Sequence, residues 1–140
     1  MADIKIKKLA AFVKDWTLDN NGIKKAFLDF YELLDSKEGV ILNFKSRPGV
    51  SHSLRASVKE KGKNERLLTL MDIIDDDPEN RWLSICFYAE TITDPREEGD
   101  IIPGGLLGED GYCFDLFDRD DEMAVYLKDR MNEACEKYLQ

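Results

Sequence analysis

The sequence predicts an α+β fold, in which a mostly antiparallel sheet of five strands follows two N-terminal helices and precedes one C-terminal helix, in the order α-α-β-β-β-β-β-α. Apolar residues recur every three or four positions near both ends of the chain, and every second position in most segments between residues 40 and 117. The connections between strands are mostly short, which favours antiparallel neighbours with the helices on one face. With 140 residues and neither repeat nor linker, we expect one domain, 1–140.

The first two helices are predicted from apolar stripes within residues 4–16 and 22–39. The first stripe consists of Ile6, Leu9, Val13 and Trp16. The second segment follows Asn20 and Asn21, either of which can accept a hydrogen bond from the first helical turn. Gly39 stands where a left-handed C-terminal cap is expected.

Strands are predicted at residues 40–47, 50–59, 66–74, 81–92 and 111–117. Pro48-Gly49, residues 61–64 and the polar residues 75–80 are expected to turn the chain between them. The fourth strand is apolar or aromatic on both faces, with Trp82, Ser84, Cys86 and Tyr88 on one and Leu83, Ile85, Phe87 and Ala89 on the other. We therefore expect a central strand, covered by helices on one side and by a loop, a ligand or a second subunit on the other.

Residues 93–110 are predicted to be a long irregular segment rich in glycine. Its two apolar pairs, Ile101-Ile102 and Leu106-Leu107, are expected either to fold back over the domain as a flap or to bury in a partner subunit. The last helix is predicted to begin after Asp118 as its N-cap, and an apolar stripe follows from Met123 to Tyr138.

The net charge of −9 is unevenly distributed, because residues 1–66 carry a net +5 and residues 67–140 a net −14. An acidic chain is repelled by phosphate backbones, so we expect no nucleic-acid binding. No apolar run is long enough to span a membrane, and the first residues lack the features of a signal peptide. The three cysteines show no close spacing, and we expect them to be reduced in a cytoplasmic protein.

Residues 46–60, SRPGVSHSLRASVKE, contain the only histidine of the chain, His52. It shares strand parity with Val50, Leu54 and Ala56, which predicts a hydrogen-bonded histidine on the apolar side. The opposite face carries a row of hydroxyls and cations, Ser51, Ser53, Arg55, Ser57 and Lys59, and Arg47 at the turn extends it. Such a row is suited to a phosphate or carboxylate, although it is also typical of a protected, solvent-facing strand.

We expect no cofactor and no metal site. The acidic segment 72–79 lacks the glycine and spacing of a calcium-binding loop, and one histidine with three scattered cysteines does not fit zinc. The glycine-rich segment likewise matches no phosphate-binding motif.

These observations lead to two main hypotheses about function and to a third, a regulator whose acidic side chains within residues 72–122 imitate nucleic acid or meet a basic partner. The first is a small cytoplasmic, non-catalytic binding domain, with a possible homodimer, that engages a protein partner or a small anionic ligand through Arg47, Ser51, His52, Ser53, Arg55 and Asp100. The alternative is a hydrolase or transferase acting on a small phosphorylated or carboxylated substrate. In that case Arg47 and Arg55 would hold the anion, while His52 or Asp100 would move the proton.

Overall fold

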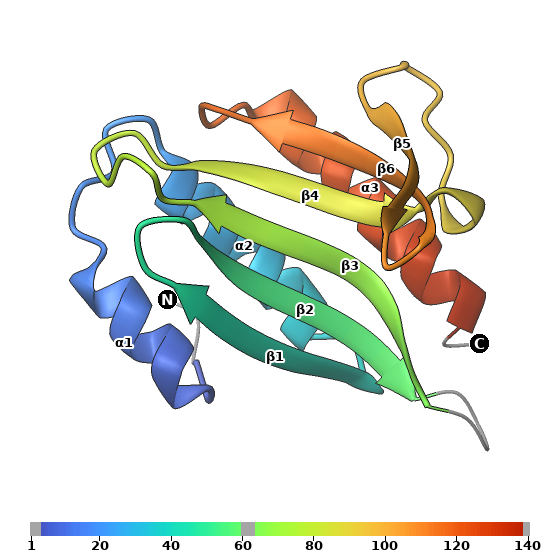
Figure 1. The fold of residues 1–140 in the computed structure, drawn as a ribbon, viewed down its shortest axis with the longest axis horizontal. Coiled ribbons are helices and arrows are strands. Elements are labelled where there is room, and N and C mark those ends of the chain that lie inside the picture. Colours follow the sequence, from blue (N-terminus) through green and yellow to red (C-terminus); the bar gives the residue numbers. More distant parts are fainter. Residues whose placement is uncertain (1–3, 60–63, 139–140) are drawn as a thin grey trace.

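The computed structural model describes residues 4–59 and 64–138, and within them one antiparallel sheet of six strands is covered on one face by three helices (Figure 1). The strands are β1 (Val40–Arg47), β2 (Ser51–Lys59), β3 (Glu65–Ile74), β4 (Trp82–Tyr88), β5 (Asp100–Leu106) and β6 (Glu109–Leu116). Their order across the sheet is β1-β2-β3-β4-β6-β5. The helices are α1 (Lys7–Asp15), α2 (Ile23–Asp35) and α3 (Asp121–Tyr138), and a short 3₁₀ helix, η1 (Ala89–Thr91), follows β4. The α+β class is therefore confirmed.

The prediction of five strands is wrong, because part of the segment expected to be irregular forms β5. This strand contains Pro103 and two glycines, residues that are depleted in strands. It lies at the edge of the sheet, where a missing N–H is tolerated, and its pairing with β6 is irregular between Ile102 and Leu106. The predicted strand 81–92 is also too long, since β4 ends at Tyr88.

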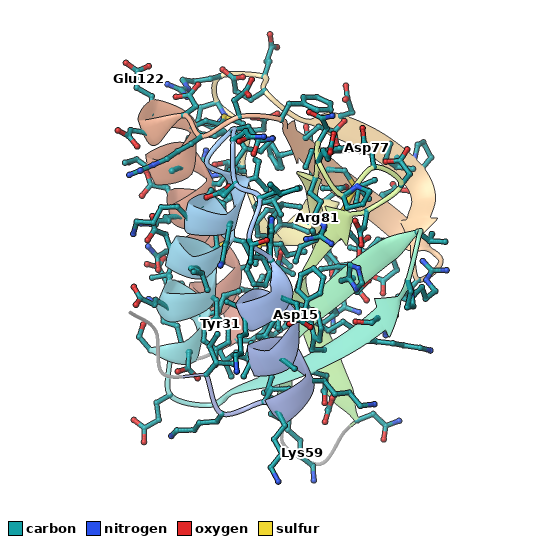
Figure 2. All side chains as sticks on the ribbon, turned by 90° about the vertical axis from the view of Figure 1, so that its left-hand side faces the viewer. Asp15, Tyr31, Lys59, Asp77, Arg81 and Glu122 are labelled. Carbon is teal, nitrogen blue, oxygen red and sulfur yellow. A yellow bond between two sulfur atoms is a disulfide. The ribbon has the colours of Figure 1, made fainter. Side chains whose placement is uncertain are left out.

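The main core lies between the sheet and the helices, which form a separate layer in the side view (Figure 2). In β4, Leu83, Ile85 and Phe87 point into this core and are fully buried. The alternating residues of β4 lie on the other face, which we call the open face because no helix covers it. The two-faced central strand predicted from the sequence is thus confirmed.

Local hydrogen bonds explain where the helices and turns occur. Asn21 Oδ1 accepts from the N–H of Ile23 at 3.3 Å, and Asp120 Oδ1 accepts from the N–H of Met123 at 3.2 Å. Asp120, and not the predicted Asp118, therefore caps the last helix. Gly49 has a φ of 80°, as the predicted Pro48-Gly49 turn requires.

The β5–β6 hairpin divides its apolar residues between the domain and solvent. Leu106 is buried on the open face in a second cluster with Leu67, Cys86 and Tyr88. Ile101, Ile102 and Leu107 are exposed by 53%, 42% and 61%, so the hairpin is anchored to the domain but presents an apolar surface.

Two further predictions concern the turn between the second and third strands and the absence of a membrane-spanning segment. The turn predicted at residues 61–64 falls almost entirely outside the described residues. No helix in the part of the chain that the structure describes has the length and apolar character needed to cross a membrane.

Candidate functional site

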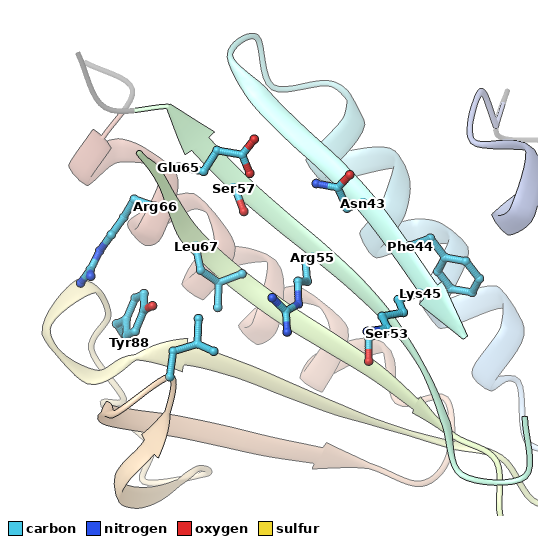
Figure 3. A pocket seen from close by; sticks show the side chains of 11 residues that line it. Asn43, Phe44, Lys45, Ser53, Arg55, Ser57, Glu65, Arg66, Leu67 and Tyr88 are labelled. Atoms are coloured by element: carbon cyan, nitrogen blue, oxygen red, sulfur yellow. The ribbon is translucent and has the colours of Figure 1, made fainter. Parts of the chain in front are cut away.

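A pocket of about 430 Å³ on the open face is the candidate site (Figure 3). Its cations are Lys45, Arg55 and Arg66, its hydroxyls belong to Ser53, Ser57 and Tyr88, and Leu67 and Leu107 are among its apolar residues. These residues come from β1, β2, β3 and β4 and from the tip of the β5–β6 hairpin. Only the tertiary structure brings the hairpin tip to the other strands.

The cations of the pocket differ in whether they are already neutralised. Arg66 binds Glu90 at 2.8 Å and Glu109 at 2.7 Å, and it stacks on the Tyr88 ring. Lys45 and Arg55, in contrast, have no hydrogen-bond or ion-pair partner among residues 4–59 and 64–138. Figure 3 shows Arg55 in the middle of the pocket, between Ser53 and Leu67. The pocket therefore offers two cations without an ion-pair partner in the described residues, and its lining also includes one carboxylate, that of Glu65.

The hydroxyls complete a set of hydrogen-bond donors around these charges. Tyr88 is 4% exposed, and its hydroxyl makes no hydrogen bond within the described part of the chain. Burial raises the pKa of Tyr88, so the phenol keeps its proton and remains a donor. Ser53 donates to Asp72 Oδ1 and is already engaged. Arg55, Lys45, Ser57 and Tyr88 are thus the groups available to an anion.

The structure separates the residues that the sequence suggested as ligand-binding. Ser53 and Arg55 line the pocket, whereas Ser51 is buried and accepts a hydrogen bond from Arg47 at 3.3 Å. Arg47 lies near the β1–β2 turn, roughly 13 Å along the strand from the level of Arg55. Asp100 is on β5, four strands away from β2. The pocket residues that sequence reasoning missed include the charged Lys45, Glu65 and Arg66 and the phenol of Tyr88.

His52 lies on the opposite face, as its parity predicted, and is 4% exposed. Its Nε2 donates to Asp75 Oδ2 at 2.6 Å, which leaves Nδ1 to accept from the exposed Ser46 hydroxyl at 2.9 Å. Arg81 closes the network, because its Nε donates to Asp75 Oδ1 at 2.7 Å.

Helix α1 covers this network. The Phe12 ring lies 4.1 Å from that of His52, and the Arg81 guanidinium lies 5.0 Å from Phe12 and 5.3 Å from Trp16. Figure 2 shows the labelled Arg81 close to α1. The network therefore ties α1 to the sheet, and it also forms an ordered Ser46–His52–Asp75 chain. Nothing in the sequence signalled that Asp75 and Arg81, which lie on a polar turn, would be its members.

Cys86 and Cys113 lie directly opposite each other on β4 and β6 and are joined by a disulfide. The prediction that all three cysteines are reduced is therefore wrong for this pair, while Cys135 is free and buried. The two cysteines are 27 residues apart, so their spacing gave no signal, and only strand pairing brings them together.

Comparisons with other proteins place no further constraint on the site. No family model, curated protein or solved structure matches this chain. Within the residues that the structure describes, no cluster of three or more histidine, cysteine, aspartate or glutamate side chains is suited to hold a metal ion.

Proposed function

We propose that this protein is a non-catalytic binding domain that captures an acidic group of a ligand or partner in the open-face pocket. The observation that carries the proposal is a pair of cations, Lys45 and Arg55, and a buried phenol beside them, none of which has an ion-pair or hydrogen-bond partner in the described residues. A guanidinium offers a planar fork of donors that matches a carboxylate or phosphate. The adjoining side chains of Leu67 and Leu107 would contact an apolar portion of the same ligand.

The burial of His52 supports a binding function over catalysis at that residue. A general acid or base must reach the proton that it moves, whereas His52 is covered by α1 and already holds two partners. The anion site and His52 are also on opposite faces of the sheet. Arg55 and His52 are therefore not proposed to act on one substrate.

The proposal is tested by titrating the protein with carboxylates and phosphorylated metabolites while its melting temperature is followed. An anion at 100 times its Kd is expected to add about 2.7 kcal/mol, a shift on the order of 5–10 °C for a domain of this size. Arg55→Ala should abolish the shift, because it removes the central charge. Arg47→Ala, which removes a cation of the same open face but outside the pocket, should retain it. Equal loss in both variants, or no shift with any anion, would contradict the proposal.

A second candidate function is acyl transfer by Ser46, which the hydrogen-bonded chain Ser46–His52–Asp75 favours. Ser46 Oγ would attack an acyl carbon while His52 takes its proton, and the leaving alcohol would receive that proton. Water would then release the acid from the acyl-serine by the same route. Ser46 is exposed, and the leaving alcohol and the water would have to approach His52 Nδ1 from the Ser46 side.

This candidate predicts covalent labelling of Ser46 by a fluorophosphonate reagent at one equivalent per chain, detected by intact mass. Asp75→Asn should slow the labelling by more than about tenfold, because the carboxylate orients His52. Ser46→Ala lacks the hydroxyl that would be labelled and is the negative control. An unlabelled wild-type protein would exclude the acyl-transfer function and leave the binding function unaffected.

Cytoplasmic placement also remains our proposal. Stable disulfides are rare in that compartment, so a Cys86–Cys113 disulfide that persists in cytoplasmic extracts would contradict this placement.

A further inference from the structure

We propose that the acidic group captured by the pocket belongs to a second copy of this chain, and that two copies pair through their open faces. This inference rests on the proposed binding function, and it names the partner for the same site. The pairing would be symmetric, with the cationic edge of each sheet lying on the acidic edge of the other.

The first argument is the separation of charge across the sheet. Residues 40–59, which contain β1 and β2, include four lysines and arginines and no aspartate or glutamate. Residues 100–116, which contain β5 and β6, include four aspartates and glutamates and no lysine or arginine. These strand pairs form the two opposite edges of one sheet (Figure 1). A surface with one charge at each edge is complementary to a copy of itself that is turned around.

The second argument is that both edges carry unpaired charge. Asp100 and Asp115 are exposed and have no ion-pair or hydrogen-bond partner in the described residues, like Lys45 and Arg55 at the other edge. Burial and the neighbouring Asp100 charge raise the pKa of Asp115. A cation from a second copy would relieve this repulsion.

The third argument is geometric. The register forms a continuous ladder across the open face: Asn43, Arg55, Leu70, Cys86, Cys113 and Asp100, from β1 to β5. We place the second copy by a twofold axis that runs parallel to the strands, between β3 and β4 and between the two open faces. This rotation reverses the strand order of the facing copy, so that β2 of one copy lies opposite β6 of the other. Arg55 then lies opposite Cys113 of the second copy, directly beside its Asp100 and two residues from its Asp115. A guanidinium reaches either carboxylate from there, since these neighbours are roughly 5–7 Å away.

The exposed apolar residues of the hairpin fit the same arrangement. Ile102, which follows the open-face Asp100 by two residues, and Leu107 at the hairpin tip are 42% and 61% exposed, and the axis brings β5 of one copy over β1 of the other. Six strands about 4.8 Å apart and some seven residues long give a face of roughly 550 Å². The two faces of the pair together would therefore bury roughly 1,100 Å². That is the lower end for a specific interface, so charge pairing is expected to contribute strongly to it.

The experiment is a charge exchange followed by sedimentation equilibrium. Arg55→Glu and Asp115→Arg should each place like charges together twice in the symmetric pair and raise the dimer Kd by about 100-fold or more. An equimolar mixture should regain wild-type affinity, because the introduced glutamate of one copy then meets the introduced arginine of the other, while the native Arg55–Asp115 contact is kept. Lys14→Glu, an exposed change of the same charge on α1, should leave the dimer intact. Raising the salt from about 0.01 to 1 M should dissociate the wild-type pair.

A monomeric wild-type protein at low salt, or two single variants that dimerise like the wild type, would overturn the pairing. A mixture that stays monomeric would also contradict it. The Asp115→Arg variant keeps Arg55, so it distinguishes failure of the proposed pairing from failure of the proposed anion binding in the pocket. If inorganic phosphate or citrate binds that variant and the binding requires Arg55, the anion site stands whatever the oligomeric state.

Discussion

Replacing Asp75 by alanine is expected to lower the free energy of unfolding by about 3–5 kcal/mol, because it leaves the buried His52 and the partly buried Arg81 without their acceptor. The Asp75 side chain is 9% exposed, and those of His52 and Arg81 are 6% and 15% exposed. Chemical denaturation followed by circular dichroism measures the change. Asp76→Ala, which removes the neighbouring exposed carboxylate, should change stability by no more than about 0.5 kcal/mol.

The same carboxylate makes a defined contribution to acid stability. Burial raises the pKa of Asp75, but the hydrogen bonds from Arg81 and His52 and the charge of Arg81 outweigh this effect, so the pKa lies below the ordinary 3.8. The carboxylate therefore stabilises the fold fully above that ordinary value, and the contribution disappears as the pH falls through the folded-state pKa. Between pH 5 and the acid transition, wild type should lose more stability than Asp75→Asn. Parallel stability curves for the two proteins would show that Asp75 does not hold the network together.

Replacing Phe114 by alanine is expected to cost about 3–5 kcal/mol, the range for removing a fully enclosed aromatic side chain. Phe114 of β6 is 0% exposed, and its ring lies 6.0 Å from Phe87 of β4 and 6.3 Å from Tyr126 of α3. The substitution therefore leaves a cavity where the acidic edge of the sheet is attached to the last helix. Unfolding by urea measures the loss.

Phe117→Ala is the matched control, because it removes the same side chain three residues away. Phe117 is 56% exposed and contacts chiefly Trp82, with 4.8 Å between the rings. Its removal should cost about 1 kcal/mol, the size of an aromatic pair contribution. Comparable losses at both positions would mean that Phe114 does not occupy the core position described above.

Several features of the fold follow from the sequence because they depend on neighbouring residues alone. The alternation within residues 50–58 determines that His52 faces the apolar side while Arg55 faces away, whatever the strand pairs with. The same reasoning gives the two apolar faces of β4, and helical spacing gives the apolar stripes of α1 and α2. These are short-range properties of the backbone. β5 was missed because a local argument counts its proline and glycines against a strand, while edge pairing with β6 tolerates them.

The sites depend on long-range pairing, which local patterns do not specify. Ser46, His52, Asp75 and Arg81 come from β1, β2 and the two ends of one turn, and they meet because β3 folds back beside β2. The order β4-β6-β5 sets Asp100 at the edge opposite Arg55, which removes it from the pocket of its own copy. In the proposed pair, the same position brings Asp100 to the second copy. The sequence by itself determined the face of each side chain within the strands that it predicted, because successive strand residues alternate between faces. Only the tertiary structure decided which side chains meet, because strand order arises from contacts between residues far apart in the chain.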